Sequence, residues 1–302
     1  MNINGYVPKK RISANKLLSL YNTSITDVFE LLHAAREFKQ KNAAKEKNDI
    51  LHGKYIALLT KNTFFRTRVA FQIATENVGG RSMIISLSGS SIEDYLKDRD
   101  GISVIRGYGV EGFAVDTAVS KDAEVLDGYS DIPLINANSK TSPCQALASL
   151  LTIWNRKSRL QDLKMAIIGN FSDCDYSLLY GAAKCGIDLN LVCPDVYEPR
   201  NSVADYCRQF CDVEIYDGIE DGLAGVDAVY IMSHDLPLSY MITENSLKFA
   251  KSDALILHPL PVRRDEEISE TLLDSPFNAI NEQAANLLPV LEAAFALTVG
   301  KK

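Results

Sequence analysis

The segment KNTFFRTRVAFQ, residues 61–72, sets two arginines around a threonine, at Arg66, Thr67 and Arg68. It follows the apolar run 55–59, whose length predicts a buried strand, and the apolar positions of 68–77 predict a helix. Backbone N–H groups and the helix dipole at such a strand-to-helix junction favour bound phosphate or carboxylate. A basic helix start that makes only surface ion pairs fits the segment as well. Both interpretations stay open on this segment alone.

The same alternation of strand and helix runs along the whole chain. Repeated units of this kind predict parallel sheets with helices on both faces. The expected fold is α/β, with two doubly wound parallel-sheet domains joined by helices, and the break lies inside or just before a helix at 145–154. Strands are expected at 83–87, 101–105, 132–135, 164–168, 189–193, 226–231 and 254–257, and helices at 24–41, 92–99, 115–119, 176–185 and 203–210.

Polar side chains are expected at the carboxyl ends of these strands, where open α/β sheets bind their ligands. They are Arg66, Arg106, Asn136, Asn170, His234 and His258. Their convergence is a stronger indication of a site than any single motif.

Composition limits the classes of function. The 302 residues suffice for two domains, and the net charge of -7 argues against a general nucleic-acid binder. No apolar run approaches the ~18 residues of a membrane span, and the N-terminus has no apolar segment of a secretory signal. The six cysteines form no C-x-x-C pair and indicate reduced thiols. We therefore expect a cytoplasmic chain with no membrane or nucleic-acid partner.

Motifs for several common activities are missing. Gly169 alone remains of a G-x-G-x-x-G turn, and neither a P-loop nor a G-x-S-x-G elbow occurs. Cys144 is interpreted as a small packing residue at a helix start, because no base is evident near it. The acidic run 265–267 is interpreted as a solvated helix start. No metal site is predicted, since Cys207 and Cys211 have no histidine nearby in sequence.

Five ordered segments together resemble the aspartate/ornithine transcarbamylase family. They are 66–68 (RTR), 104–106 (VIR), 142–148 (SPCQALA), 258–264 (HPLPVRR) and 283–286 (QAAN). The lead-in 17–53 and the segment 143–147 are similar to the ornithine branch. Each segment is short, but their order and spacing make the resemblance specific, and it covers nearly the whole chain.

The resemblance implies two domains and a reaction. The first, at 1–143 with a returning C-terminal helix at 286–302, would bind carbamoyl phosphate, and the second, at 144–285, would bind an amine. A carbamoyl group would pass from carbamoyl phosphate to the amino group of an amino acid or amine, with release of phosphate and without a metal or cofactor. The implied partners are these small molecules and further copies of the chain, because the active sites lie between subunits of a homotrimer or a multiple of trimers.

The resemblance also implies roles for individual residues. Arg66, Thr67 and Arg106 would hold phosphate, Gln145 would orient the carbamoyl amide, and the Leu260 carbonyl would accept from the NH2 group of the donor. Arg106 and Gln145 are the expected catalytic residues. The expected substrate-binding residues are Phe65, Arg66, Thr67, Arg106, Ser142, Gln145, Asp173, His234, His258 and Leu260.

Several positions depart from the family pattern. Phe64 and Phe65 replace hydroxyl residues, Ser142 replaces the histidine that polarises the carbonyl, and the segment 88–91 lacks the long side chain lent to a neighbouring subunit. The acceptor segments match neither the ornithine nor the aspartate pattern. Acids such as Asp173 would suit a cationic acceptor, or they are solvated loop acids.

Three hypotheses follow from these matches and departures. The chain transfers carbamoyl groups to an unidentified amine. Alternatively, it is a paralogue with weak or no activity that serves as a binding or assembly subunit, or it uses another acyl donor, for which Phe64 and Phe65 would line an apolar subsite. We favour carbamoyl transfer, because Arg66 and Arg106 are both retained at separate expected strand ends.

Overall fold

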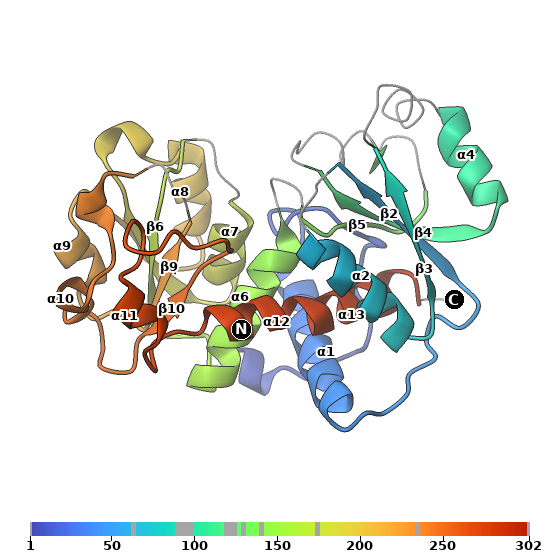
Figure 1. Ribbon diagram of the computed structural model, residues 1–302, viewed down its shortest axis with the longest axis horizontal. Coiled ribbons are helices and arrows are strands. Elements are labelled where there is room, and N and C mark those ends of the chain that lie inside the picture. The colour runs from blue at the N-terminus through green and yellow to red at the C-terminus, as the bar shows by residue number, and fades with distance from the viewer. Residues whose placement is uncertain are drawn as a thin grey trace. The chain divides into compact units, whose positions relative to one another are not determined.

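The chain forms two compact units (Figure 1), seen in a computed structural model that describes residues 2–61, 65–87, 99–117, 126–127, 131–138, 142–172, 176–232 and 236–300. The N-terminal unit comprises Val7–Leu147 and the chain from Leu287 onward. The C-terminal unit comprises Ala148–Asn286 and the chain up to Tyr6. The division therefore falls at 147/148, where 143/144 was expected, and the first residues belong with the second half of the sequence.

The N-terminal unit is built on a five-stranded parallel sheet with the strand order β1-β5-β4-β2-β3. Its strands are β1 (Lys16–Leu17), β2 (Tyr55–Thr60), β3 (Arg81–Ser86), β4 (Val110–Asp116) and β5 (Leu134–Asn136). Its helices are α1 (Ile25–Ala43), α2 (Phe65–Asn77), α4 (Arg99–Gly107), α13 (Leu287–Thr298) and the first part of α6 (Pro143–Lys157). The C-terminal α13 packs against α1 and α2 (Figure 1).

The first helix begins where the sequence predicts it. Ser24 is the N-cap of α1, and its hydroxyl accepts a hydrogen bond from the Asp27 N–H at 3.1 Å. This bond satisfies one of the donors that a helix start leaves open. Val28, Leu31 and Leu32 are buried on one face of the helix, so the predicted amphipathic helix at 24–41 is confirmed.

The strand expected at 101–105 is wrong, because these residues belong to α4. Ile102 and Ile105 are three residues apart and both contact the core, which is helical spacing. The strand follows as β4, where Gly112 allows a close approach: a Cβ there would lie 2.8 Å from Val299 Cγ2. The helix expected at 115–119 is wrong for Val115 and Asp116, which end β4.

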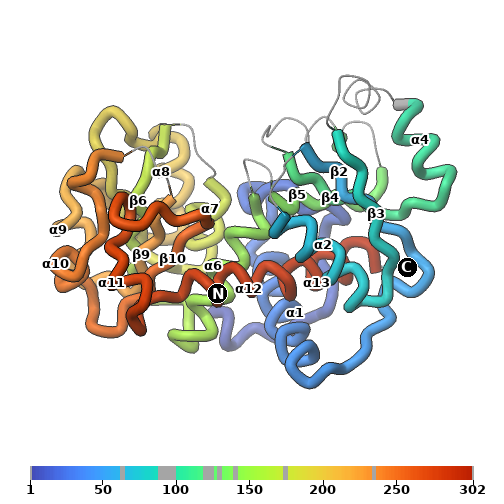
Figure 2. The backbone as a smooth tube through the Cα atoms, viewed as in Figure 1, coloured from blue at the N-terminus to red at the C-terminus, as the bar shows by residue number. Residues whose placement is uncertain are grey.

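The C-terminal unit contains a second five-stranded parallel sheet with the order β10-β9-β6-β7-β8. Figure 2 shows β10, β9 and β6 side by side. The strands are β6 (Leu163–Ile168), β7 (Ile187–Val192), β8 (Val213–Tyr216), β9 (Ala228–Ile231) and β10 (Leu255–Leu257). The helices are the rest of α6, α7 (Ser177–Lys184), α8 (Asn201–Cys207), α9 (Ile219–Leu223), α10 (Glu244–Leu247), α11 (Glu270–Leu273) and α12 (Ile280–Ala285).

Two parallel sheets flanked by helices confirm the α/β prediction. Each unit has its own apolar core beneath its sheet, with Phe113 in the N-terminal unit and Ile256 in the C-terminal unit among the buried side chains. Among the helices of the described residues, none has the length and apolar character needed to cross a membrane.

Candidate functional site

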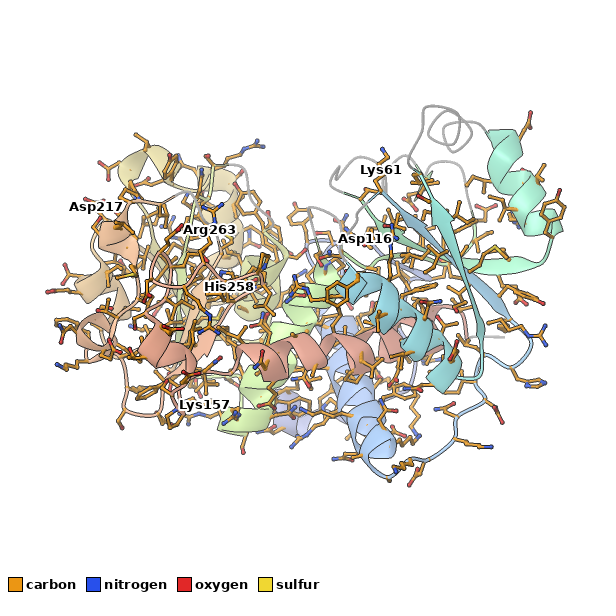
Figure 3. All side chains as sticks on the ribbon, viewed as in Figure 1. Lys61, Asp116, Lys157, Asp217, His258 and Arg263 are labelled. Atoms are coloured by element: carbon orange, nitrogen blue, oxygen red, sulfur yellow. The ribbon has the colours of Figure 1, made fainter. Side chains whose placement is uncertain are left out.

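The carboxyl ends of β2, β4 and β5 bring three buried polar residues to one edge of the N-terminal sheet. They are Thr60, Asp116 and Asn136. Thr60 and Asp116 are register partners across β2 and β4, and the Lys61 N–H donates to the Asp116 carbonyl at 3.1 Å. Figure 3 shows Lys61 and Asp116 at this edge. We call it the N-terminal edge.

The first turn of α2 adds a cation and a hydroxyl to this part of the fold. The helix begins at Phe65, so Arg66 and Thr67 lie inside the helix and not in a loop before it. Thr67 is 3 % exposed and Arg66 is half-buried, whereas Phe65 is 72 % exposed. Burial lowers the pKa of the Arg66 guanidinium, which stays charged at neutral pH because its ordinary pKa is above 12. A charged guanidinium at a helix N-terminus suits an anion.

The buried Asp116 was missed by the sequence analysis. Its Oδ1 accepts from Asn138 Nδ2 at 3.3 Å, and its Oδ2 accepts from Thr60 Oγ1 at 3.5 Å. The signal that could have found it is the run VEGFAVD at 110–116, in which an acid directly follows a short apolar segment. Asp116 therefore places a carboxyl group at the strand end where the guanidinium of Arg106 was expected.

Arg106 lies at the opposite edge of the same sheet. It is an exposed residue in the last turn of α4 and lines a cavity of about 480 Å³ together with Val110, Glu111 and Pro133, at the amino ends of β4 and β5. The prediction that Arg106 ends a strand on the side of Arg66 is therefore wrong. The reason is the helical α4, which shifts the strand to later residues.

The start of α6 presents the remaining predicted residues of this unit. Ser142 is buried, and its hydroxyl accepts from the Gln145 N–H at 3.3 Å, as an N-cap does. Gln145 is half-buried in the first turn. Burial raises the pKa of the Cys144 thiol to about 12, so this cysteine is not a thiolate nucleophile. The binding roles of Ser142 and Gln145 stay predictions.

At the carboxyl end of β10, a buried network surrounds His258 (Figure 3). The His258 N–H donates to Gln283 Oε1 at 2.9 Å, and its Nδ1 accepts from the Leu260 N–H at 2.8 Å. Its Nε2 lies 3.2 Å from Glu267 Oε2. Because Nδ1 accepts, the neutral ring carries its proton on Nε2, which faces the carboxylate. We call this region the C-terminal edge.

Glu267 is not part of a solvated helix start, as the sequence analysis expected. It is 6 % exposed, and its Oε2 accepts from the Arg263 N–H at 2.7 Å. The network therefore fixes both ends of the turn 258–263. Within that turn Leu260 has a φ of 61°, in the left-handed region that non-glycine residues rarely adopt. A backbone held this way presents the Leu260 carbonyl in a fixed direction.

The segment QAAN at 283–286 supports this edge from α12. Gln283 Nε2 donates to Ser149 Oγ at 3.0 Å, and Asn286 Nδ2 donates to Thr152 Oγ1 at 2.7 Å. Both acceptors lie on α6 within the same unit. The motif thus ties β10 to α6 through side chains that are themselves buried.

A cavity of about 60 Å³ lies in the C-terminal unit beside this network. It is lined by Ile168 and Ile231, which end β6 and β9, and by Leu236, Pro237, Leu238, Tyr240, Glu266 and Glu267. The Tyr240 hydroxyl donates to Asp217 Oδ1 at 2.7 Å, and burial together with this bond raises the pKa of Tyr240. Apolar walls with acids at one side can hold a small group that carries N–H donors.

Two of the predicted substrate-binding residues, Asp173 and His234, lie outside the described residues, as do Phe64 and the segment 88–91. Asn170 follows β6, as expected, and its Oδ1 accepts from the Ser172 N–H at 3.0 Å within its own turn.

Comparison with known proteins agrees with this two-unit arrangement. Residues 15–155 match "Aspartate/ornithine carbamoyltransferase, carbamoyl-P binding domain", and residues 161–298 match "Aspartate/ornithine carbamoyltransferase, Asp/Orn binding domain". The chain is 30 % identical to the ornithine carbamoyltransferase of Bacillus subtilis over 95 % of its length and 94 % of that protein.

Solved structures give the same result. The ornithine carbamoyltransferase of Pyrococcus furiosus superposes with a TM-score of 0.87 at 26 % identity, covering 96 % of this chain and 98 % of that one. The aspartate transcarbamoylase of Trypanosoma cruzi in complex with carbamoyl phosphate shares the fold, with a TM-score of 0.84 at 22 % identity and coverage of 97 % of each chain. The chain therefore belongs to the aspartate/ornithine carbamoyltransferase family.

Proposed function

We propose that the protein transfers a carbamoyl group from carbamoyl phosphate to the amino group of an amino acid or amine. The observation that supports this most is the placement of Arg66 and Thr67 in the first turn of a helix that follows a parallel strand. A half-buried guanidinium and outward backbone N–H groups in one helical turn suit a phosphate. The match to a carbamoyl-phosphate-binding domain over 15–155 points to the same ligand.

The proposed chemistry needs an uncharged amine held in line with the carbamoyl carbon. The amine nitrogen forms the new N–C bond, the C–O bond to phosphate breaks, and its electron pair leaves with phosphate. The nitrogen then loses a proton to solvent. Gln145 would orient the carbamoyl amide, and Arg66 would neutralise charge on the leaving phosphate. The active sites would lie between subunits of a homotrimer or of a multiple of trimers.

Release of phosphate from carbamoyl phosphate tests the function directly. The purified protein is incubated with carbamoyl phosphate and a panel of amino acids and amines that includes ornithine and aspartate. We expect amine-dependent phosphate release that is lost in Arg66→Ala. Light scattering of the same sample measures the number of subunits. Absence of amine-dependent release with every amine contradicts the proposal.

A weakly active or inactive binding subunit is the second candidate, and Asp116 is the observation that favours it. A carboxylate at the N-terminal edge reduces the positive charge available to a phosphate dianion. Binding of carbamoyl phosphate without turnover of any amine would support this alternative.

A further inference from the structure

A cavity of about 640 Å³ lies in the N-terminal unit beside α1. Its lining residues come from the segment before β1, from α1, from Ile50 and from the end of α13. As far as the structure describes the chain, the residues that line it include none from the strands or from α2, so it is separate from the N-terminal edge. Sites for small molecules typically have volumes of about 300–1,000 Å³. We call this one the α1 cavity.

One part of the α1 cavity is apolar. Phe38 of α1 and Leu297 of α13 line it with side chains that are otherwise buried. Ala34 and Ala296 add small side chains, and Ile50 lines the cavity while 45 % of its surface stays exposed. These residues offer contact to the apolar body of a ligand.

The other part of the lining carries more cations than its ionised Glu37 can pair. Lys41 Nζ lies 2.7 Å from Glu37 Oε1 and 5.7 Å from the centre of the Phe38 ring. The hydrogen bond from Lys41 lowers the pKa of Glu37, so this carboxyl is ionised at neutral pH. Lys10 Nζ is 3.7 Å from Glu37 Oε2, too far for a hydrogen bond, and its side chain is 76 % exposed. Arg36 adds a further cation to the lining.

The backbone holds Lys10 at the α1 cavity. Glu30 is 2 % exposed, and its two carboxylate oxygens accept hydrogen bonds from the Lys9 and Lys10 N–H groups, the latter at 2.9 Å. Lys10 has a φ of 55°, in the left-handed region. Glu30 therefore fixes the main chain from which the Lys10 ammonium extends, and its own charge faces backbone donors.

We propose that the α1 cavity binds an amphipathic anion, an organic carboxylate with an apolar body. The apolar body lies against Phe38 and Leu297, and the carboxylate pairs with the ammonium group of Lys10. The whole chain has a net charge of -7, so the excess of cations at this cavity is a local feature that selects the sign of the ligand. The proposal goes beyond the proposed function, because it concerns a second site with a different ligand.

Calorimetric titration with 2-naphthoate and with 2-naphthylmethylammonium tests the proposal, because the two probes share an apolar body and differ in the sign of the charge. We expect the wild-type protein to bind 2-naphthoate at least about fivefold more tightly than the cation. Lys10→Gln should weaken 2-naphthoate about two- to fivefold, the range of an exposed ion pair, and should not weaken the cation.

Lys9→Gln is the matched control, because it makes the same change at an exposed neighbour that does not line the cavity. It should leave both affinities unchanged. Ala34→Phe fills the cavity and should abolish binding of 2-naphthoate, with circular dichroism to check that this variant folds. Lys10→Gln changes a mostly exposed side chain, so its result does not depend on the folding of Ala34→Phe.

Three outcomes overturn the proposal. They are equal binding of the two probes, equal effects of Lys10→Gln and Lys9→Gln on 2-naphthoate, and no binding of 2-naphthoate to the wild-type protein at millimolar concentration. None of these measurements uses carbamoyl phosphate or an amine acceptor. Failure of the proposed function therefore leaves this result unchanged.

Discussion

At the N-terminal edge, Arg66 and Asp116 lie on different elements, and Asp116 is contacted by Asn138 and Thr60 at 3.3 and 3.5 Å. At the C-terminal edge, His258 instead forms a buried network with Gln283, Leu260 and Glu267, with contacts of 2.9, 2.8 and 3.2 Å. The carboxyl ends of parallel strands therefore carry a buried carboxyl beside neutral groups in one unit, and a histidine bonded to the backbone of a turn in the other.

The two edges differ in the groups that they offer to a ligand, which are side chains at the N-terminal edge and backbone groups at the C-terminal edge. A guanidinium in the first turn of a helix, such as that of Arg66, can pair directly with a negative charge on a ligand. At the C-terminal edge, His258 and Glu267 accept hydrogen bonds from backbone N–H groups and so hold the turn that presents the Leu260 carbonyl. We infer that the N-terminal edge recognises charge, and that the C-terminal edge recognises its ligand through main-chain groups. Four predictions test this comparison.

The largest effect is expected from His258→Ala, which breaks the network of the C-terminal edge. Loss of the imidazole removes the acceptor of the Leu260 N–H and a neighbour of the buried Glu267 carboxylate, and a buried polar group that loses a partner typically costs about 1–3 kcal/mol of unfolding free energy. The single tryptophan, Trp154, is buried in the C-terminal unit, so its fluorescence during urea denaturation reports on this unit. The control is His52→Ala, which changes an exposed histidine of the other unit. A loss of unfolding free energy below about 1 kcal/mol would mean that the contacts of His258 contribute little to the stability of the C-terminal unit.

Arg66→Ala should weaken phosphate binding at the N-terminal edge without unfolding the protein. Hydrogen bonds to a charged group contribute about 1.5–3 kcal/mol, so the affinity for carbamoyl phosphate should fall roughly tenfold to a hundredfold. Arg106→Ala provides the contrast, because Arg106 lies at the amino end of β4 and its removal should change the affinity by less than about twofold. Equal losses in both variants would contradict the assignment of the site to one edge. Calorimetry measures both.

Ser24→Ala should destabilise only the N-terminal unit. Removing this N-cap hydroxyl costs about 1 kcal/mol of unfolding free energy. Circular dichroism, which sees both units, should shift to lower urea concentration, while the Trp154 fluorescence transition stays in place. Ser24→Asp retains an acceptor and should behave like the wild type. A shift of both signals together would show that the two units unfold as one.

The smallest effect is expected at Glu292, a buried carboxyl of the N-terminal unit that accepts hydrogen bonds from side-chain amides. Its Oε1 accepts from Asn77 Nδ2 at 2.6 Å and its Oε2 from Asn42 Nδ2 at 2.8 Å. Burial raises its pKa above the ordinary value, so its contribution to stability is present at low pH and is lost as the pH rises through the folded-state pKa. Glu292→Gln should therefore stabilise the unit at pH 8, where it removes a buried charge. At pH 4 the substitution should change the stability little, because the Asn42 amide can turn and offer its oxygen to the new NH2 group.

Thermal unfolding across this pH range measures the Glu292 effect. Glu111→Gln, a change at an exposed carboxyl of the same unit, is the matched control and should leave the pH profile unchanged. A profile for Glu292→Gln that runs parallel to the wild type would show that the pKa of Glu292 is the same in the folded and unfolded states.

Local patterns in the sequence were sufficient for elements whose periodicity and end signals agree. The helix begun by Ser24 and the strand at 55–60 are examples, because hydroxyl cap, apolar face and apolar run all indicate the same element. The segment 101–105 gives conflicting signals. Its β-branched residues favour a strand, while Ile102 and Ile105 have helical spacing, and only packing against the sheet decides between them.

The order of apolar runs and motifs along the chain was enough to predict the α/β class, the family and the position of Arg66 and Thr67 after a buried strand. That Asp116 and not Arg106 ends β4 follows from the folded sheet, because strand ends depend on pairing with β2 and β5 and on the space that Gly112 leaves for Val299. The tertiary structure also decided that Glu267 is buried against His258. The partner of a buried charge is brought to it by the fold and cannot be read from neighbours along the chain.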